Sequence, residues 1–168
     1  SSDVCSSDLE WSRQFCRKDK VFLDIGAHTG TYTISLAKDC KKVYSFEPQQ
    51  QTYYALCGGV SLSNLTNVKC MQVGLGSLDQ VGPKILNIVS YDGGGSSLHV
   101  SADHAVIEKE QIEVVTLDSL CIKDPIGFIK MDVEENELYV LQGAVNTLES
   151  NDWPTIMMEI NNIDRKST

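Results

Sequence analysis

Apolar residues along this chain occur in two kinds of pattern. Short continuous runs bounded by polar turns predict buried parallel strands, whereas apolar residues three or four apart predict helices packed on a sheet by one face. The runs lie at residues 21–25, 43–46, 68–73, 126–131 and 155–160. Strands and helices that alternate in this way predict an α/β fold with a parallel core sheet and flanking helices.

Helical spacing follows three of these runs. A first helix is predicted from Thr31, and a second over residues 49–62, although Gly58 and Gly59 weaken that prediction. A third helix is predicted after the fourth run, with Leu138, Leu141, Val145 and Leu148 on one face. Its first turn would include Glu134, Glu135 and Glu137, because acidic residues complement the helix dipole there.

Residues 84–116 interrupt the alternation. Two segments, 85–89 and 112–116, have strand character, and the Gly- and Ser-rich stretch 91–98 lies between them. We expect an inserted antiparallel pair that flanks a loop. That loop is either a lid over a substrate or a plain connector.

The segment between the first strand and the first helix, Asp24-Ile25-Gly26-Ala27-His28-Thr29-Gly30, predicts a cofactor cradle. Small residues at a strand-to-helix turn let backbone N–H groups approach a ligand, and the helix directs its positive end there. His28 stands where a second glycine is common, and histidine tolerates left-handed backbone conformations better than most residues.

Glu47 follows the second strand, about 20 residues after Gly26, where nucleotide-binding folds present an acid to ribose hydroxyls. A dinucleotide fingerprint would read G-x-G-x-x-G, which this loop lacks. The loop instead has the pattern Asp/Glu-x-Gly-x-Gly-x-Gly with one substitution. That pattern resembles the S-adenosylmethionine (SAM) loop of class I methyltransferases.

Several blocks together resemble the FkbM-type branch of the Rossmann-like class I methyltransferases. They are DIGAHTG, SFEP, NLTNVKCMQVGLG, VTLDSL, IKMDVEENELYVLQGA and MMEI, and they span residues 21–160. Only Glu135 departs from the family pattern of the fifth block, which has glycine there. The class I sheet usually continues with an antiparallel hairpin after its fifth strand, and no such hairpin is evident here.

The resemblance implies SAM as the cofactor and a role for each matching residue. Asp24, Gly26, His28 and Gly30 would form the site for its methionine end, Glu47 would hold the ribose hydroxyls, and Gly74 and Leu75 would approach the adenine. The class I strand order 3-2-1-4-5 would place Asp132 beside the glycine loop, at the topological switch point. Asp132, Glu134 and Glu159 are candidates for orienting or deprotonating an acceptor, and His99 and His104 are further candidates.

The implied activity is O-methylation of a hydroxyl on a sugar, a glycan or another small metabolite. One alternative is a non-catalytic SAM-binding module or inactive fragment, and a less favoured one is an NAD-dependent oxidoreductase. Asp132, Glu134 and Glu137 have oxygen ligands suited to a hard cation. Because Lys130 lies beside them and helix capping explains the acids, we expect no metal.

Composition narrows the class of partner. The net charge of −9 and the pI near 4.7 argue against a nucleic-acid partner, because nucleic-acid binding needs clustered Lys and Arg. The six cysteines include no C-x-x-C pair, so free thiols are expected. No apolar run is long enough to span a membrane, and no signal-peptide pattern opens the chain, which favours a cytoplasmic location.

The 168 residues suit one domain, expected over residues 10–168 and possibly truncated. Residues 1–9, SSDVCSSDL, have no periodicity. They match the reading-frame translation of a common sequencing-library adapter. We therefore expect this stretch to be a non-native or disordered tail outside the fold.

Overall fold

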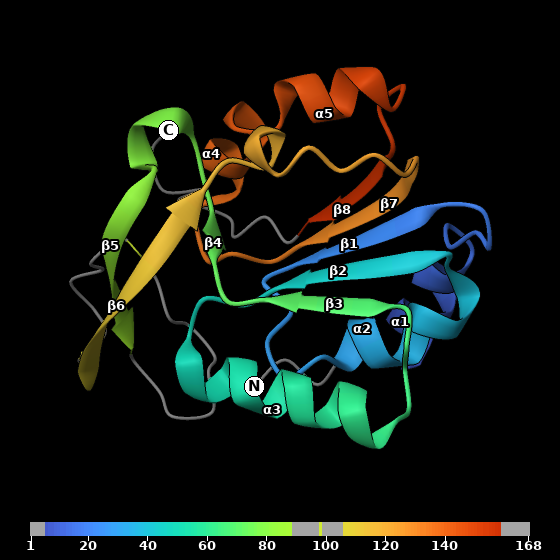
Figure 1. Cartoon of the computed structure of the whole chain (residues 1–168), viewed down its shortest axis with the longest axis horizontal. Coiled ribbons are helices and arrows are strands. Elements are labelled where there is room, and N and C mark those ends of the chain that lie inside the picture. Colours follow the sequence, from blue (N-terminus) through green and yellow to red (C-terminus); the bar gives the residue numbers. More distant parts are fainter. Residues whose placement is uncertain (1–5, 89–97, 99–105, 159–168) are drawn as a thin grey trace, which may run out of the picture.

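A computed structural model describes residues 6–88, 98 and 106–158 of the protein (Figure 1). Its centre is a parallel sheet with strand order β3-β2-β1-β7-β8. The strands are β1 (Val21–Ile25), β2 (Lys42–Phe46), β3 (Val68–Met71), β7 (Ile126–Met131) and β8 (Thr155–Met158). The order confirms the class I arrangement, since β7 and β8 are the fourth and fifth strands of this sheet.

Helices cover both faces of the parallel sheet, as Figure 1 shows. One face carries α1 (Ser6–Arg13), α2 (Thr31–Leu36) and α3 (Gln50–Leu62), and the other carries α4 (Glu137–Gln142) and α5 (Val145–Ser150). Residues of β1 alternate between the two sides: Leu23 belongs to the core beneath α4 and α5, and Phe22 stacks on Phe128 on the opposite side. Asp24 therefore points to the same side as Phe22, toward α2.

A second, smaller sheet stands beside the carboxyl ends of the parallel strands (Figure 1). It consists of β4 (Gly74–Leu75), β5 (Gly82–Ile88) and β6 (Glu108–Val115), in the order β4-β6-β5. Strands β5 and β6 are antiparallel, which confirms the predicted inserted pair. Residues 89–97 and 99–105 lie outside the described residues, so the lid remains a prediction.

Three single-turn 3₁₀ helices complete the described elements: η1 (Ala37–Asp39), η2 (Leu78–Gln80) and η3 (Asp118–Leu120). Helix α3 continues through Gly58 and Gly59. A Cβ at Gly59 would lie 2.7 Å from Ile34 Cδ1. Glycine at that position therefore allows α3 to pack closely against α2.

The prediction of one helix after Asp132 is wrong, because the segment forms the two short helices α4 and α5. A Cβ at Gly143 would overlap the carbonyl oxygen of Gly76, so the chain passes the second sheet at backbone contact distance. The Asp118 carboxylate then caps α5, accepting hydrogen bonds from the N–H of Asn146 at 3.1 Å and of Thr147 at 2.8 Å. This break changes which apolar side chains are buried. Val140, Ala144 and Leu148 are buried, whereas Leu138 and Val145 are exposed.

The three acids expected in one helical turn are also separated. Only Glu137 lies in the first turn of α4. Glu134 and Glu135 precede the helix with φ values of 46° and 69°, in the left-handed region. The family glycine at position 135 thus corresponds to a backbone conformation that glycine adopts with little strain.

Helix α1 begins at Ser6, within the stretch set aside as a tail, and the origin of residues 1–9 stays a prediction. The described cysteines are free thiols, and Cys40 is the buried one among them. Across the described parts of the chain, no helix combines the length and apolar character needed to cross a membrane.

Candidate functional site

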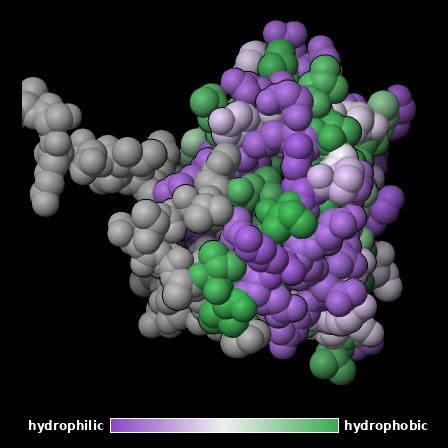
Figure 2. Space-filling model, turned by 90° about the vertical axis from the view of Figure 1, so that its left-hand side faces the viewer, coloured by the Kyte–Doolittle hydropathy of each residue, from purple (hydrophilic) through white to green (hydrophobic). Residues whose placement is uncertain are grey.

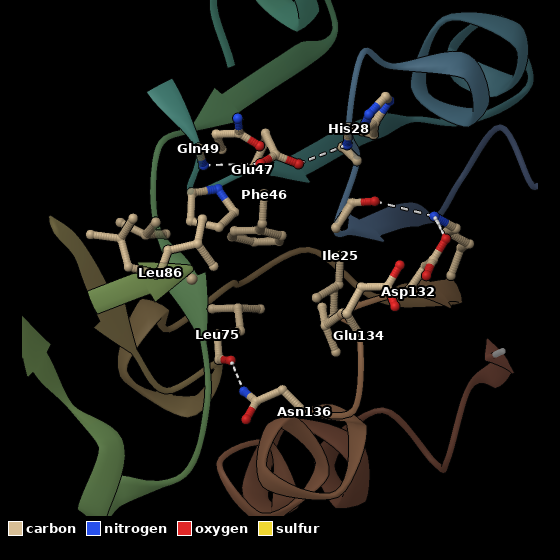
Figure 3. A pocket seen from close by; sticks show the side chains of 18 of the residues that line it. Ile25, His28, Phe46, Glu47, Gln49, Leu75, Leu86, Asp132, Glu134 and Asn136 are labelled. Atoms are coloured by element: carbon tan, nitrogen blue, oxygen red, sulfur yellow. Dashed lines mark hydrogen bonds and ion pairs between the residues drawn. The ribbon is translucent and has the colours of Figure 1, made fainter. Parts of the chain in front are cut away.

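A cavity of about 400 Å³ lies at the carboxyl edge of the parallel sheet, facing the second sheet. The glycine loop, the end of β2, strand β4, the segment after β7, and Leu86, Leu98 and Ile112 of the inserted region line it. Figure 2 shows the molecule from this side, where apolar side chains form small areas on a mostly polar face. In Figure 3, Glu47 lies at one end of the cavity and Asn136 at the other.

The glycine loop is held against its neighbours through its backbone. Gly26 has a φ of 73°, and a Cβ there would overlap the carbonyl oxygen of Asp132. The N–H groups of Gly26 and Ala27 both donate to the carbonyl oxygen of Phe46, at 3.0 and 2.9 Å. These two amides are therefore engaged within the protein, whereas the sequence pattern favoured amides directed at a ligand.

Glu47 closes the loop from the end of β2. Its side chain accepts hydrogen bonds from the N–H groups of His28 and Gln49, each at 2.9 Å (Figure 3). The residue is only 7% exposed, yet it lines the cavity. Burial raises the pKa of the Glu47 carboxyl to about 7, although the two backbone hydrogen bonds oppose that shift. A pKa of about 7 means that this carboxyl gains or loses its proton near neutral pH.

Asp24 and Gly30 do not line the cavity, in contrast to the expectation from the sequence. The Asp24 carboxylate is fully buried and accepts hydrogen bonds from the N–H and hydroxyl of Thr33, at 2.9 and 2.6 Å. Burial raises its pKa, and the positive charge of Lys130 acts in the opposite direction. A Cβ at Gly30 would lie 2.6 Å from Leu56 Cδ1 of α3. Asp24 and Gly30 therefore support the conformation of the loop through contacts in the protein interior.

Three charged residues at the end of β7 lie at the cavity: Lys130, Asp132 and Glu134. The Lys130 ammonium donates to the Gly26 carbonyl oxygen at 3.2 Å and lies 3.4 Å from Asp132 Oδ2. Asp132 thus lies beside the glycine loop, as predicted, and Glu134 lines the same cavity. Leu86 lies across the cavity from them (Figure 3).

The remaining candidates from the sequence are a metal site, Glu159 and two histidines. Within the described ranges, no group of three or more His, Cys, Asp or Glu side chains could hold a metal ion. Glu159, His99 and His104 lie outside the described residues.

The far end of the cavity is formed by Gly74 and Leu75, and by Asn136, which the sequence analysis missed. The Asn136 side-chain amide donates to the Leu75 carbonyl oxygen at 3.1 Å and accepts from Gln80 Nε2 at 3.0 Å. Asn136 occupies the N-cap position of α4, and an Asn just before an apolar helix is the sequence signal that could have marked it.

Residues 24–166 match the profile described as the methyltransferase FkbM domain. The chain belongs to the FkbM methyltransferase family. No curated protein matches the sequence significantly.

Solved structures with the same fold as this FkbM methyltransferase are distant in sequence. An rRNA methylase from Streptococcus thermophilus is 14% identical with a TM-score of 0.52, covering 90% of this chain and 69% of its own. The protein SMU.1697c from Streptococcus mutans, solved in complex with SAH, is 12% identical with a TM-score of 0.52. The match covers 90% of this chain and 69% of that protein. A precorrin 8w decarboxylase from Methanobacterium thermoautotrophicum is 15% identical with a TM-score of 0.59. The match covers 96% of this chain and 67% of that protein. These similarities confirm the Rossmann-like fold.

Membership of the FkbM family makes SAM the cofactor of this methyltransferase, as predicted. The cavity is compatible with it, since about 400 Å³ is within the range of small-ligand pockets. Its walls also combine apolar groups, such as Phe46 and Leu75, with the carboxylates of Glu47, Asp132 and Glu134. An acidic cavity suits a ligand that carries a sulfonium and an ammonium group.

Proposed function

We propose that this FkbM methyltransferase transfers a methyl group from SAM to a hydroxyl of a sugar, a glycan or another small metabolite. The observation that supports the proposal is the placement of Glu47 and Asp132 at one cavity. They directly follow β2 and β7, the strands on either side of β1. Glu47 would hold the ribose hydroxyls, the loop at Gly26 and His28 would contact the methionine end, and Gly74 and Leu75 would contact the adenine.

SAM supplies a methyl group on a sulfonium, which is already activated for displacement. The protein's main task is therefore to hold the acceptor oxygen in line, and positioning of this kind accounts for much of the rate of such reactions. A hydroxyl acceptor must also release its proton. The Asp132 carboxylate is about one-third exposed at the cavity and is our first candidate for orienting the hydroxyl or accepting this proton, ahead of Glu134 and Glu159.

A nucleic-acid acceptor is the competing substrate class, because one of the structures with this fold is an rRNA methylase. That similarity, at 14% identity, concerns the fold. The net charge of −9 opposes binding to a phosphate backbone. We therefore favour an acceptor without a nucleic-acid backbone.

The experiment is incubation with SAM labelled in its methyl group, together with extracts rich in glycans and polyketides, and separately with total RNA. We expect labelled small molecules whose fragmentation places the methyl group on oxygen, and no such product with Asp132→Asn. Labelled RNA would replace the proposed acceptor class. SAM binding without any labelled product would favour a non-catalytic module.

A further inference from the structure

Lys130 is a buried cation on β7, and the proposed methyl transfer does not use it. It is paired in register with Asp24 across β1 and β7, and both side chains point toward α2. Lys130 is 7% exposed and Asp24 is fully buried. Burying two charges is costly unless each is compensated, so the position of the ammonium relative to its partners is informative.

The ammonium does not lie closest to Asp24. Lys130 Nζ is 4.0 Å from Asp24 Oδ1, but 3.2 Å from the Gly26 carbonyl oxygen and 3.4 Å from Asp132 Oδ2. It also lies 5.2 Å from the centre of the Tyr32 ring, within cation–π range. Asp24 Oδ1 has no hydrogen-bond partner among the described residues.

These distances argue against charge compensation as the only role of Lys130. A lysine present only to neutralise Asp24 would place its ammonium against the Oδ1 atom that lacks a partner. The ammonium is instead displaced toward the cavity, where it bridges Gly26 and Asp132, the residues that directly follow β1 and β7. Among the described residues that line the cavity, it is the only Lys or Arg.

We infer that Lys130 is a positioning residue of the cofactor site. Its ammonium joins the Gly26 carbonyl to the Asp132 carboxylate, so the glycine loop and the end of β7 form one rigid wall. The backbone contact between Gly26 and Asp132 fixes the main chains at this point, and Lys130 fixes the Asp132 side chain to them. The inference depends on SAM binding in this cavity and does not depend on the identity of the acceptor.

The test is the affinity for S-adenosylhomocysteine (SAH), measured by calorimetry and compared with stability in urea. Lys130→Met removes the charge while keeping a side chain of similar length, and Lys38→Met at an exposed lysine is the matched control. We expect SAH binding at least tenfold weaker in Lys130→Met and unchanged in Lys38→Met. The urea midpoint of Lys130→Met should also fall, because Asp24 loses its counter-charge.

A double variant separates positioning from charge compensation. Asp24→Asn combined with Lys130→Met removes both buried charges, so the urea midpoint should return toward that of the wild type. Under our inference the double variant still binds SAH at least tenfold more weakly than the wild type does. Recovery of SAH affinity together with the midpoint would show that Lys130 only balances Asp24, and affinity within twofold of wild type in Lys130→Met would also overturn the inference.

If the urea midpoint of the double variant does not return toward that of the wild type, Lys130→Gln distinguishes positioning from charge compensation. Glutamine retains a donor for the Gly26 carbonyl and the Asp132 carboxylate but has no charge for Asp24. We expect it to bind SAH more tightly than Lys130→Met does, and equal affinities would contradict the positioning role. Absence of a methylated hydroxyl product would count against the proposed acceptor without affecting these measurements.

Discussion

The Glu47 side chain accepts a hydrogen bond from the backbone N–H of His28 at 2.9 Å, and this contact joins the end of β2 to the glycine loop. The same carboxyl binds the N–H of Gln49 at the approach to α3. Glu47 therefore has two roles that the sequence suggested only in part. It orders the loop around the cavity, and under the proposed function it would also present a carboxyl group to the ribose hydroxyls of SAM.

Replacing Glu47 by alanine should weaken SAM binding roughly tenfold to a hundredfold, since a hydrogen bond to a charged group contributes about 1.5 to 3 kcal/mol. Calorimetric titration with SAM measures this effect. Glu149→Ala is a suitable control because Glu149 is an exposed acid on α5 that does not line the cavity. Unchanged affinity in Glu47→Ala would remove Glu47 from the site.

The raised pKa of Glu47 predicts that stability depends on pH. Its ordinary value is 4.5 and its value in the folded protein is about 7, so between these pH values the folded protein holds a proton that the unfolded chain has released. The resulting stabilisation is fully present below pH 4.5 and is lost as the pH rises through 7. Between pH 5.5 and 8 the free energy of unfolding should fall by about 2 kcal/mol from this group.

Urea unfolding of the wild type and of Glu47→Gln at these two pH values isolates the contribution of Glu47. Asp24, whose pKa is also raised by burial, is present in both proteins, so its contribution largely cancels from the comparison. The same loss of stability with pH in Glu47→Gln would assign the effect to another group.

Gly26→Ala should destabilise the protein by about 3 kcal/mol or more, because a side chain there is strained at positive φ and overlaps the Asp132 carbonyl. Binding of SAM should be lost with it. Gly58→Ala is the matched control, since a Cβ at Gly58 meets no atom within 4 Å and alanine favours a helix interior by about 1 kcal/mol. The midpoint temperature of thermal unfolding should fall for Gly26→Ala and rise for Gly58→Ala.

Glu135→Gly should stabilise the protein by about 0.5 to 1 kcal/mol. Relief of the left-handed conformation at φ 69° outweighs the greater freedom that glycine gives the unfolded chain. In the control Glu149→Gly, the glycine lies within α5 and should lower the free energy of unfolding by roughly 0.5 to 1 kcal/mol. A lower unfolding midpoint for Glu135→Gly would show that the Glu135 side chain makes a stabilising contact worth more than the strain.

The central strands could be predicted closely from the sequence. Strands β1 and β7 have the predicted bounds, 21–25 and 126–131, and β2 begins one residue earlier than expected. Each of these strands has neighbours on both sides and helices over both faces, so its sequence is a nearly continuous apolar run. The order of the sheet could be anticipated only through the family resemblance.

The helices that end against the second sheet could not be predicted in this way. The division between α4 and α5 depends on Gly76 and Asp118, which are remote in sequence from Gly143. Likewise, the N-terminus of α3 is capped by Glu110 of β6, whose carboxylate accepts from the N–H of Gln50 at 2.9 Å. Local spacing cannot detect a cap that another part of the chain supplies.

The sequence by itself determined the α/β alternation, the family and the residues that end the strands, because apolar periodicity and a conformationally demanding loop are written locally in the chain. Only the tertiary structure decided what those residues contact. It turned Asp24 away from the cavity, engaged the loop amides with Phe46, and placed Lys130 between Gly26 and Asp132. The physical reason is that hydrogen bonds and buried charges depend on distances of a few ångströms between strands, which are set only once the sheet is assembled.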